Sequence, residues 1–90
     1  MAANTQNIVM TRGISLKTLD NIGFANHVQA SLDRFRSNDW GDNIDPEDWK
    51  ANDSKDNQYA LGSYEIGWEK IWIIREYDGS ITTVLLPEEH

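Results

Sequence analysis

The densest group of side chains that could carry chemistry in this 90-residue chain lies in one short acidic segment, residues 38–58. The segment contains seven carboxylates and two tryptophans against two lysines, a local charge of −5 out of −7 for the whole chain. Clustered carboxylates can bind a metal ion, act as acid and base, or present negative charge to a cationic partner. The candidate residues are Asp39, Trp40, Asp42, Asp45, Glu47, Asp48 and Trp49.

Their sequence context argues against catalysis and metal binding. Asp42, Asp45 and Asp48 are spaced by three, but acid–base catalysis needs carboxyl groups in buried, unequal environments. Here they stand among Asn, Asp and Lys, so we expect them to be hydrated. A nuclease-like acidic–x–Lys motif would need another acidic residue from a separate strand, and Ile44 occupies a ligand position of a calcium loop. We predict no catalytic residue, no metal site and no cofactor.

The rest of the chain adds little material for catalysis. There is no cysteine, and the two histidines are His27, on a predicted helix, and His90, the last residue of the sequence. The glycines at 62, 67 and 79 do not have the spacing of a phosphate-binding loop. These observations predict a protein that is not an enzyme.

Charge determines which partners such a chain attracts. With a pI near 4.5, it should repel nucleic acid and anionic membranes but suit a basic protein surface. Trp40 and Trp49 are either apolar anchors for that partner or residues that fasten the segment to the core. The lack of cysteine, of a signal-peptide pattern and of an apolar run of about 20 residues predicts a cytoplasmic protein.

Two helices are predicted around the acidic segment. The first covers residues 20–37, with Asp20 or Asn21 as its cap, because apolar residues recur there with helical spacing. These residues are Phe24, Val28, Leu32 and Phe35. The second begins at Asp45, a good N-cap that is followed by Pro46, and should end near Asn57. Ile44 and Trp49 stand at the two positions of a hydrophobic staple at its start.

Strands are predicted on both sides of these helices. They cover residues 8–11, 61–66, 70–77 and 80–86. A two-residue turn at Asp78-Gly79 would pair Ile73 with Val84 on one face of a hairpin and Trp72 with Leu85 on the other. Both faces are apolar near the open end. Either the two helices cover different faces, or one face meets a second chain in a sheet-mediated dimer.

Together these elements predict one small α+β domain over residues 8–90, preceded by a flexible tail at residues 1–7. The predicted order is β-α-α-β-β-β, with a mostly antiparallel sheet, a C-terminal hairpin and helices mainly on one side. The predicted core residues are Ile8, Met10, Phe24, Val28, Leu32, Phe35, Ile71, Ile73, Val84 and Leu86.

Several stretches, taken together, resemble a family of short proteins from mobile genetic elements. They are Thr11-Arg12-Gly13, Asp39-Trp40-Gly41-Asp42, Glu47-Asp48, Asn52-Asp53, residues 71–76 and residues 82–89. Bacterial plasmids, integrative elements and phages carry these proteins, which are often described as "plasmid-related protein" or "type I restriction endonuclease subunit M". A methyltransferase subunit needs a nucleotide-binding domain and a catalytic motif, and this chain contains neither.

The resemblance implies accessory cargo of mobile DNA, and small acidic phage cargo proteins are often inhibitors of host defence, including anti-CRISPR proteins. One hypothesis is therefore an acidic inhibitor that covers the nucleic-acid-binding surface of a defence nuclease such as a Cas effector. Its carboxylates would replace phosphates, and its two tryptophans would act as anchors. The alternative is a non-enzymatic accessory or regulatory module of the mobile element, in the form of a sheet-mediated dimer.

Overall fold

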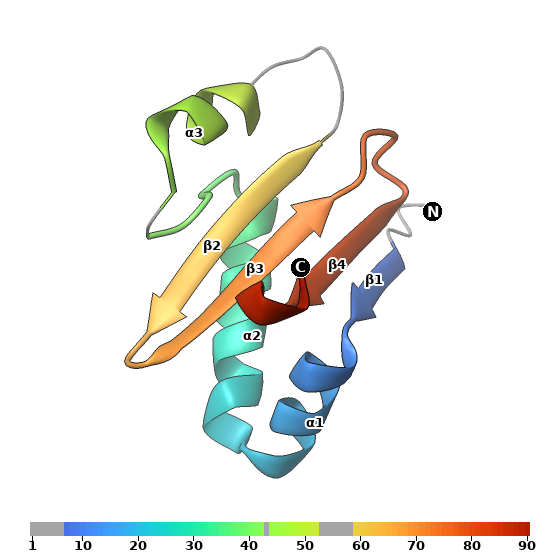
Figure 1. The fold of residues 1–90 in the computed structure, drawn as a ribbon, viewed down its shortest axis with the longest axis vertical. Helices are drawn as coiled ribbons and strands as arrows, with labels where there is room; N and C mark the ends of the chain where they lie inside the picture. The colour runs from blue at the N-terminus through green and yellow to red at the C-terminus, as the bar shows by residue number, and fades with distance from the viewer. Residues whose placement is uncertain (1–6, 43, 53–58) are drawn as a thin grey trace.

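The computed structural model describes residues 7–42, 44–52 and 59–90, and it shows a mixed four-stranded sheet with helices α1 and α2 behind it (Figure 1). The order β-α-α-α-β-β-β confirms the predicted α+β class. The strands are β1 (Asn7–Met10), β2 (Ala60–Ile66), β3 (Glu69–Arg75) and β4 (Ile81–Leu85). The helices are α1 (Arg12–Asp20), α2 (Ile22–Arg36), α3 (Pro46–Asn52) and the 3-10 helix η1 (Pro87–Glu89). The predicted tail before Asn7 and the predicted helix end near Asn57 lie outside the described residues.

The hairpin of β3 and β4 has the register that the sequence predicts. Ile73 lies opposite Val84 and Trp72 opposite Leu85. The turn itself is wider than predicted, because it is closed by a hydrogen bond from Gly79 N–H to the carbonyl of Glu76 at 2.9 Å. The strand order is β1-β4-β3-β2, and β1 pairs with β4 in parallel. That pair was not predicted, since it depends on a crossover rather than on a local turn.

The predicted helix over residues 20–37 corresponds to α2, but a further helix precedes it. Asn21 has an extended backbone that ends α1, and its side chain accepts a hydrogen bond from Phe24 N–H at 3.1 Å at the start of α2. Ile14 is the only buried residue of α1, and the residues three and four positions after it are Lys17 and Thr18. The segment therefore shows almost no apolar repeat with helical spacing. This is why α1 escaped prediction.

The core lies between the sheet and the helices α1 and α2. All four predicted apolar residues of α2 are buried in it, facing Ile71, Ile73, Val84 and Leu86. Ile8 is partly buried against this core, whereas the prediction for Met10 is wrong, because Met10 is 41% exposed on the edge strand β1. Within this core cluster, the residues that the sequence did not predict are Ile14, Trp40, Ala60 and Tyr64.

The two apolar faces of the hairpin are covered unequally. Ile71 and Ile73 face the helices, while Trp72 lies on the opposite face and is only partly buried. Its ring packs edge-on against His90, with 5.3 Å between centroids, and η1 lies in front of the sheet (Figure 1). The opposite face is therefore covered in part by the C-terminal residues, and α3 borders it beside Leu61 and Trp72. Within the parts of the chain that are described, no helix is long and apolar enough to cross a membrane.

Burial of His27 in α2 makes stability depend on pH. Its Nε2 atom is buried without a hydrogen-bond partner among the described residues. Burial lowers the pKa of His27 below 6.5, Arg34 lowers it further, and Glu69 and Asp42 partly oppose this shift. The unfolded chain therefore binds a proton near pH 6.5 that the folded chain resists, so stability is lost as pH falls below this value.

We expect the free energy of unfolding to fall more steeply between pH 7.5 and pH 5.5 in the natural chain than in His27→Gln. Gln does not titrate, so the difference between the two proteins isolates the imidazole from all other acidic groups. Urea unfolding at several pH values, followed by far-UV circular dichroism, gives both curves. If the free energy of unfolding changed with pH equally in both proteins, His27 would contribute nothing to the pH dependence.

Candidate functional site

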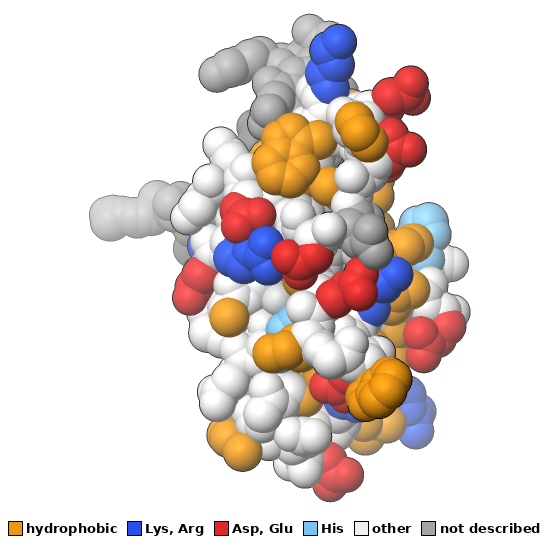
Figure 2. Space-filling view, turned by 90° about the vertical axis from the view of Figure 1, so that its left-hand side faces the viewer, with side chains coloured by type: hydrophobic (Ala, Val, Ile, Leu, Met, Phe, Trp, Pro, Cys, Tyr) orange, Lys and Arg blue, Asp and Glu red, His pale blue; other side chains and the backbone are white. Residues whose placement is uncertain are grey.

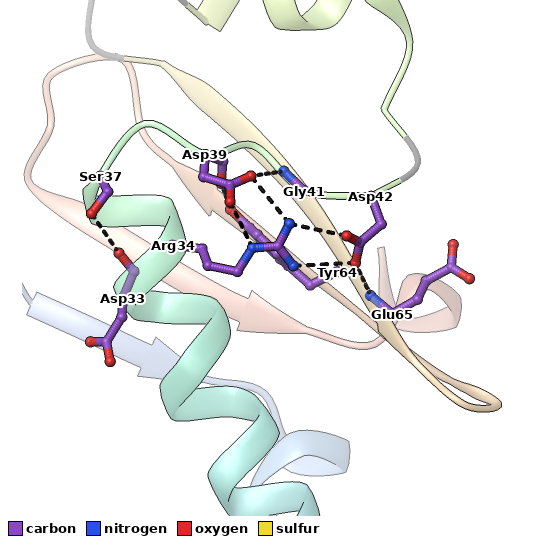
Figure 3. Close-up of polar contacts among 8 residues, drawn as sticks. All are labelled: Asp33, Arg34, Ser37, Asp39, Gly41, Asp42, Tyr64 and Glu65. Atoms are coloured by element: carbon purple, nitrogen blue, oxygen red, sulfur yellow. Dashed lines mark hydrogen bonds and ion pairs between the residues drawn. The ribbon is translucent and has the colours of Figure 1, made fainter.

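Two of the candidate carboxylates are held by Arg34, in the last turn of α2. Its Nε donates to Asp39 Oδ2 at 2.8 Å and its Nη2 donates to Asp39 Oδ1 at 3.2 Å. On the other side, Nη2 and Nη1 donate to the two carboxylate oxygens of Asp42 at 3.0 and 3.3 Å. Figure 3 shows the guanidinium lying between the two carboxylates, and its carbon lies 5.2 Å from the centre of the Tyr64 ring. Both carboxylates are thus paired within the chain.

The segment of residues 39–42, here named the strap, runs along the outer edge of β2. Ser63 N–H donates to the carbonyl of Trp40, and Asp42 N–H donates to the carbonyl of Ser63, both at 2.9 Å. Gly41 bridges to Ser63 with φ of 111°, and an added Cβ would lie 1.8 Å from the Ser63 oxygen. Only glycine fits so close a contact in this conformation. The strap is therefore part of the fold.

Trp40 lies in the core. Its side chain is 1% exposed and packs edge-on against Phe35, with 5.2 Å between ring centroids. Beside it, the hydroxyl of Tyr64 donates to the carbonyl of Asp39 at 2.8 Å. Of the two roles predicted for Trp40, the structure shows the one that fastens the segment to the core and not the exposed partner anchor, because the strap directs this ring inward while its carboxylates stay outside.

Pairing with Arg34 changes what Asp39 and Asp42 can do. Hydrogen bonds from Arg34 lower the pKa of both carboxyl groups, and backbone N–H groups of Gly41 and Glu65 lower them further. The side chains remain 42% and 38% exposed, yet a partner's cation would have to compete with these bonds. Asp42, which the sequence predicts to be hydrated, and Asp39 are thus both paired with an arginine of the same chain.

The other three candidate carboxylates remain available on α3. Asp45 Oδ1 accepts a hydrogen bond from Glu47 N–H at 2.9 Å, as predicted for the cap of this helix. Asp45, Glu47 and Asp48 are exposed, and no cation among the described residues forms an ion pair with them. Their charge therefore faces solvent.

Trp49 provides an apolar surface beside these carboxylates. Its side chain is 38% exposed and borders a shallow hollow of about 430 Å³ with Ile44, Pro46 and Lys50. Ile44 also packs against the core, so one wall of the hollow is fixed. In Figure 2 hydrophobic and acidic side chains lie together toward the top of the face, and acidic and basic ones alternate across its middle. We name α3 with Asp45 and Ile44 the acidic end.

Asn52 fastens the acidic end to the sheet. Its side-chain Nδ2 donates to the carbonyl of Leu61 at 2.8 Å, and its Oδ1 accepts from Leu61 N–H at 3.0 Å. The amide thus pairs with β2 as a neighbouring strand would, and the residue is buried. Sequence reasoning missed this residue, since a single Asn at the end of a polar helix carries no distinguishing pattern.

Comparisons with known proteins add no assignment to this geometry. No protein-family model, no curated protein and no solved structure matches the chain. Among residues 7–42, 44–52 and 59–90, no three His, Asp or Glu side chains form a group that could hold a metal ion. The resemblance to mobile-element proteins stays a prediction.

Arg34→Met tests whether the arginine holds the strap. We expect it to lower the free energy of unfolding by about 1–2 kcal/mol at pH 7, a modest value because the ion pairs are partly exposed. The matched control is Arg36→Met, an exposed residue two positions along the same helix, which should change stability by less than about 0.5 kcal/mol. Urea denaturation compares the two.

The same pair of variants has a defined pH dependence. The folded-state pKa values of Asp39 and Asp42 lie below 3.8, so the stabilisation by Arg34 is present above that pH and lost as pH falls through the folded values. The difference between the natural chain and Arg34→Met should therefore shrink below pH 3.8. Equal stability of Arg34→Met and Arg36→Met at pH 7 would show that the bonds from Arg34 to Asp39 and Asp42 contribute nothing to stability.

Proposed function

We propose that the chain is a non-enzymatic protein-binding module that docks its acidic end onto a basic surface of another protein. One observation carries this proposal: three exposed carboxylates, without a cation bonded to them among the described residues, stand beside the half-exposed Trp49. Opposite charge gives orientation and a fast encounter, and a tryptophan in a shallow hollow gives apolar contact area. The binding residues are Asp45, Glu47, Asp48 and Trp49.

The contacts that attach the acidic end to the sheet and the core support a binding role. Asn52 holds the end of α3 to β2, Ile44 packs against the core before its start, and the strap fixes the chain upstream. A surface held on both sides loses little conformational entropy when it binds. Asp39 and Asp42, which also belong to the predicted site, contribute by holding the strap, and Trp40 contributes by packing in the core.

The partner class that fits this surface is a basic nucleic-acid-binding protein. The lysines and arginines that bind phosphates in such a protein would pair with Asp45, Glu47 and Asp48. Together with the resemblance to phage and plasmid proteins, this leads to an anti-CRISPR-like inhibitor of a host defence nuclease, such as a Cas effector, in the bacterial cytoplasm. The chain itself would bind no nucleic acid or membrane.

A second candidate is the non-enzymatic accessory or regulatory module. It is favoured by β1, a four-residue edge strand without a charged residue, on which Val9 and Met10 are exposed. An edge of this kind can pair with another strand, which would give the sheet-mediated dimer. Val9→Lys would abolish such a dimer without touching the acidic end.

Charge-neutral variants of α3 test the docking proposal. The double variant Glu47→Gln/Asp48→Asn should weaken binding to purified Cas effector complexes at least about tenfold and reduce inhibition of DNA cleavage equally. The matched control Asp20→Asn/Glu76→Gln removes two exposed charges elsewhere and should change affinity less than about twofold. Biolayer interferometry at 50 and 200 mM salt measures both, and the affinity of the natural chain should fall as salt rises.

Three outcomes would contradict the docking proposal. Equal losses in both double variants would show that only net charge matters. Unchanged binding by Trp49→Ala would show that Trp49 is not an apolar anchor. Failure of the natural chain to bind any Cas or restriction complex would rule out the inhibitor hypothesis. Asp39→Asn/Asp42→Asn should lower stability while leaving affinity nearly unchanged in the folded protein.

A further inference from the structure

The end of the molecule opposite α3 exposes several large apolar side chains. They are Leu16, Leu19 and Ile22 around the junction of α1 and α2, and Ile66 and Trp68 at the turn between β2 and β3. Figure 1 shows both of these segments at the lower end of the fold, with α3 at the upper end. We name these five residues the apolar end. Ile66 and Trp68 border one hollow, and large exposed apolar side chains of this kind are typical of an interaction site.

Trp68 projects furthest from this end. It is 99% exposed, on the two-residue turn Gly67-Trp68 that joins Ile66 to Glu69. Gly67 has φ of 59°, and glycine at the first position is what a tight hairpin turn of this type needs. The turn therefore forms without any contribution from the indole, since Gly67 supplies the conformation. A tryptophan that the fold does not use, held on a tight turn, is suited to insertion into another surface.

The turn forms one wall of a hollow of about 530 Å³, through Gly67 and Trp68. The other walls include Phe24 and Leu86 from the core and Lys17 from α1. The Nζ atom of Lys17 lies 5.4 Å from the centre of the Phe24 ring. A cation at this place is positioned to contact an aromatic ring that enters from outside. The hollow has the size of a small-ligand pocket, so it accommodates an indole.

We propose that two copies of this chain dimerise through their apolar ends, each inserting Trp68 into the hollow of the other. The projecting ring and the hollow lie next to each other on one surface. A two-fold axis passing between them would therefore form both contacts at once, as in most homodimers. No other chain is required for either contact.

Charge at the rim of the hollow favours a second copy as the occupant. Lys17 and Lys70 stand there with Glu69 and Glu88, two charges of each sign, so the rim is complementary to itself. Lys17 and Glu69 already lie 3.8 Å apart within one copy. Docking at the apolar end also places the two acidic ends far apart, which limits repulsion between chains that each carry −7.

The area is that of a weak but specific dimer. One aromatic side chain buries about 150–250 Å². Two inserted indoles with the walls that receive them, and the flanking leucines and isoleucines, give on the order of 1,000 Å², the lower limit for a biological interface. We therefore expect a dissociation constant in the micromolar range. This contact is independent of the proposed function, because it leaves both acidic ends free.

Sedimentation velocity of the full chain between about 2 and 200 µM tests the proposal. The natural chain should shift from monomer to dimer across this range, and Trp68→Ala should stay monomeric or raise the dissociation constant at least tenfold. Trp49→Ala is the matched control, a tryptophan on the opposite end, and it should dimerise like the natural chain. Circular dichroism verifies that each variant is folded.

A second variant separates this interface from the sheet edge. Lys17→Glu should weaken the dimer by turning the balanced rim acidic, whereas Val9→Lys on β1 should leave it unchanged. A natural chain that is monomeric at 200 µM would overturn the proposal. A dimer that survives Trp68→Ala, or one that Val9→Lys removes, would overturn it as well. Unchanged nuclease binding by Trp68→Ala would show that dimerisation and docking are separate properties.

Discussion

The placement of Arg34 between Asp39 and Asp42 is the interaction on which the acidic half of the molecule depends. Two carboxylates brought close together repel each other, and the planar guanidinium removes this repulsion while bonding to both. The guanidinium carbon also lies over the ring of Tyr64, so the charged group is tied to a core residue. With the strap fixed in this way, Trp40 enters the core. A lysine could not replace the arginine, because a single ammonium group cannot form the same fork.

The strap and α3 together close one edge of the sheet. Outward N–H groups on β2 each have an acceptor: Leu61 bonds to the side chain of Asn52, Ser63 to the carbonyl of Trp40, and Glu65 to the carboxylate of Asp42. Exposed strand edges invite pairing with other chains, so a closed edge protects against unspecific association. The same bonds also attach the acidic end to the sheet. Protection of β2 and positioning of α3 are therefore achieved by one set of contacts.

The sequence predicted those features that local patterns encode. The register of β3 and β4 follows from alternation about the turn, the buried face of α2 from its apolar spacing, and the start of α3 from its Asp-Pro cap. It did not predict the parallel pair of β1 and β4, which depends on a contact between distant segments, or α1, which has almost no helical apolar repeat. For Trp40 it left burial as one of two alternatives. The pairing of Arg34 with Asp39 and Asp42 could have been predicted from local sequence. The arginine ends a helix, Asn38 with φ of 63° reverses the chain, and the carboxylates follow five and eight residues after the arginine.

The two ends of the molecule should respond to salt in opposite directions. Docking of the acidic end gains from attraction between opposite charges, which salt screens over about 8 Å at physiological ionic strength. Dimerisation at the apolar end gains from burial of Trp68 and its neighbours, and it is opposed by repulsion between two chains of −7. Salt weakens that repulsion and leaves apolar burial intact. In the two proposed contacts, charge would select a basic partner at the acidic end, whereas burial of Trp68 with the balanced charges around the hollow would hold a second copy at the apolar end.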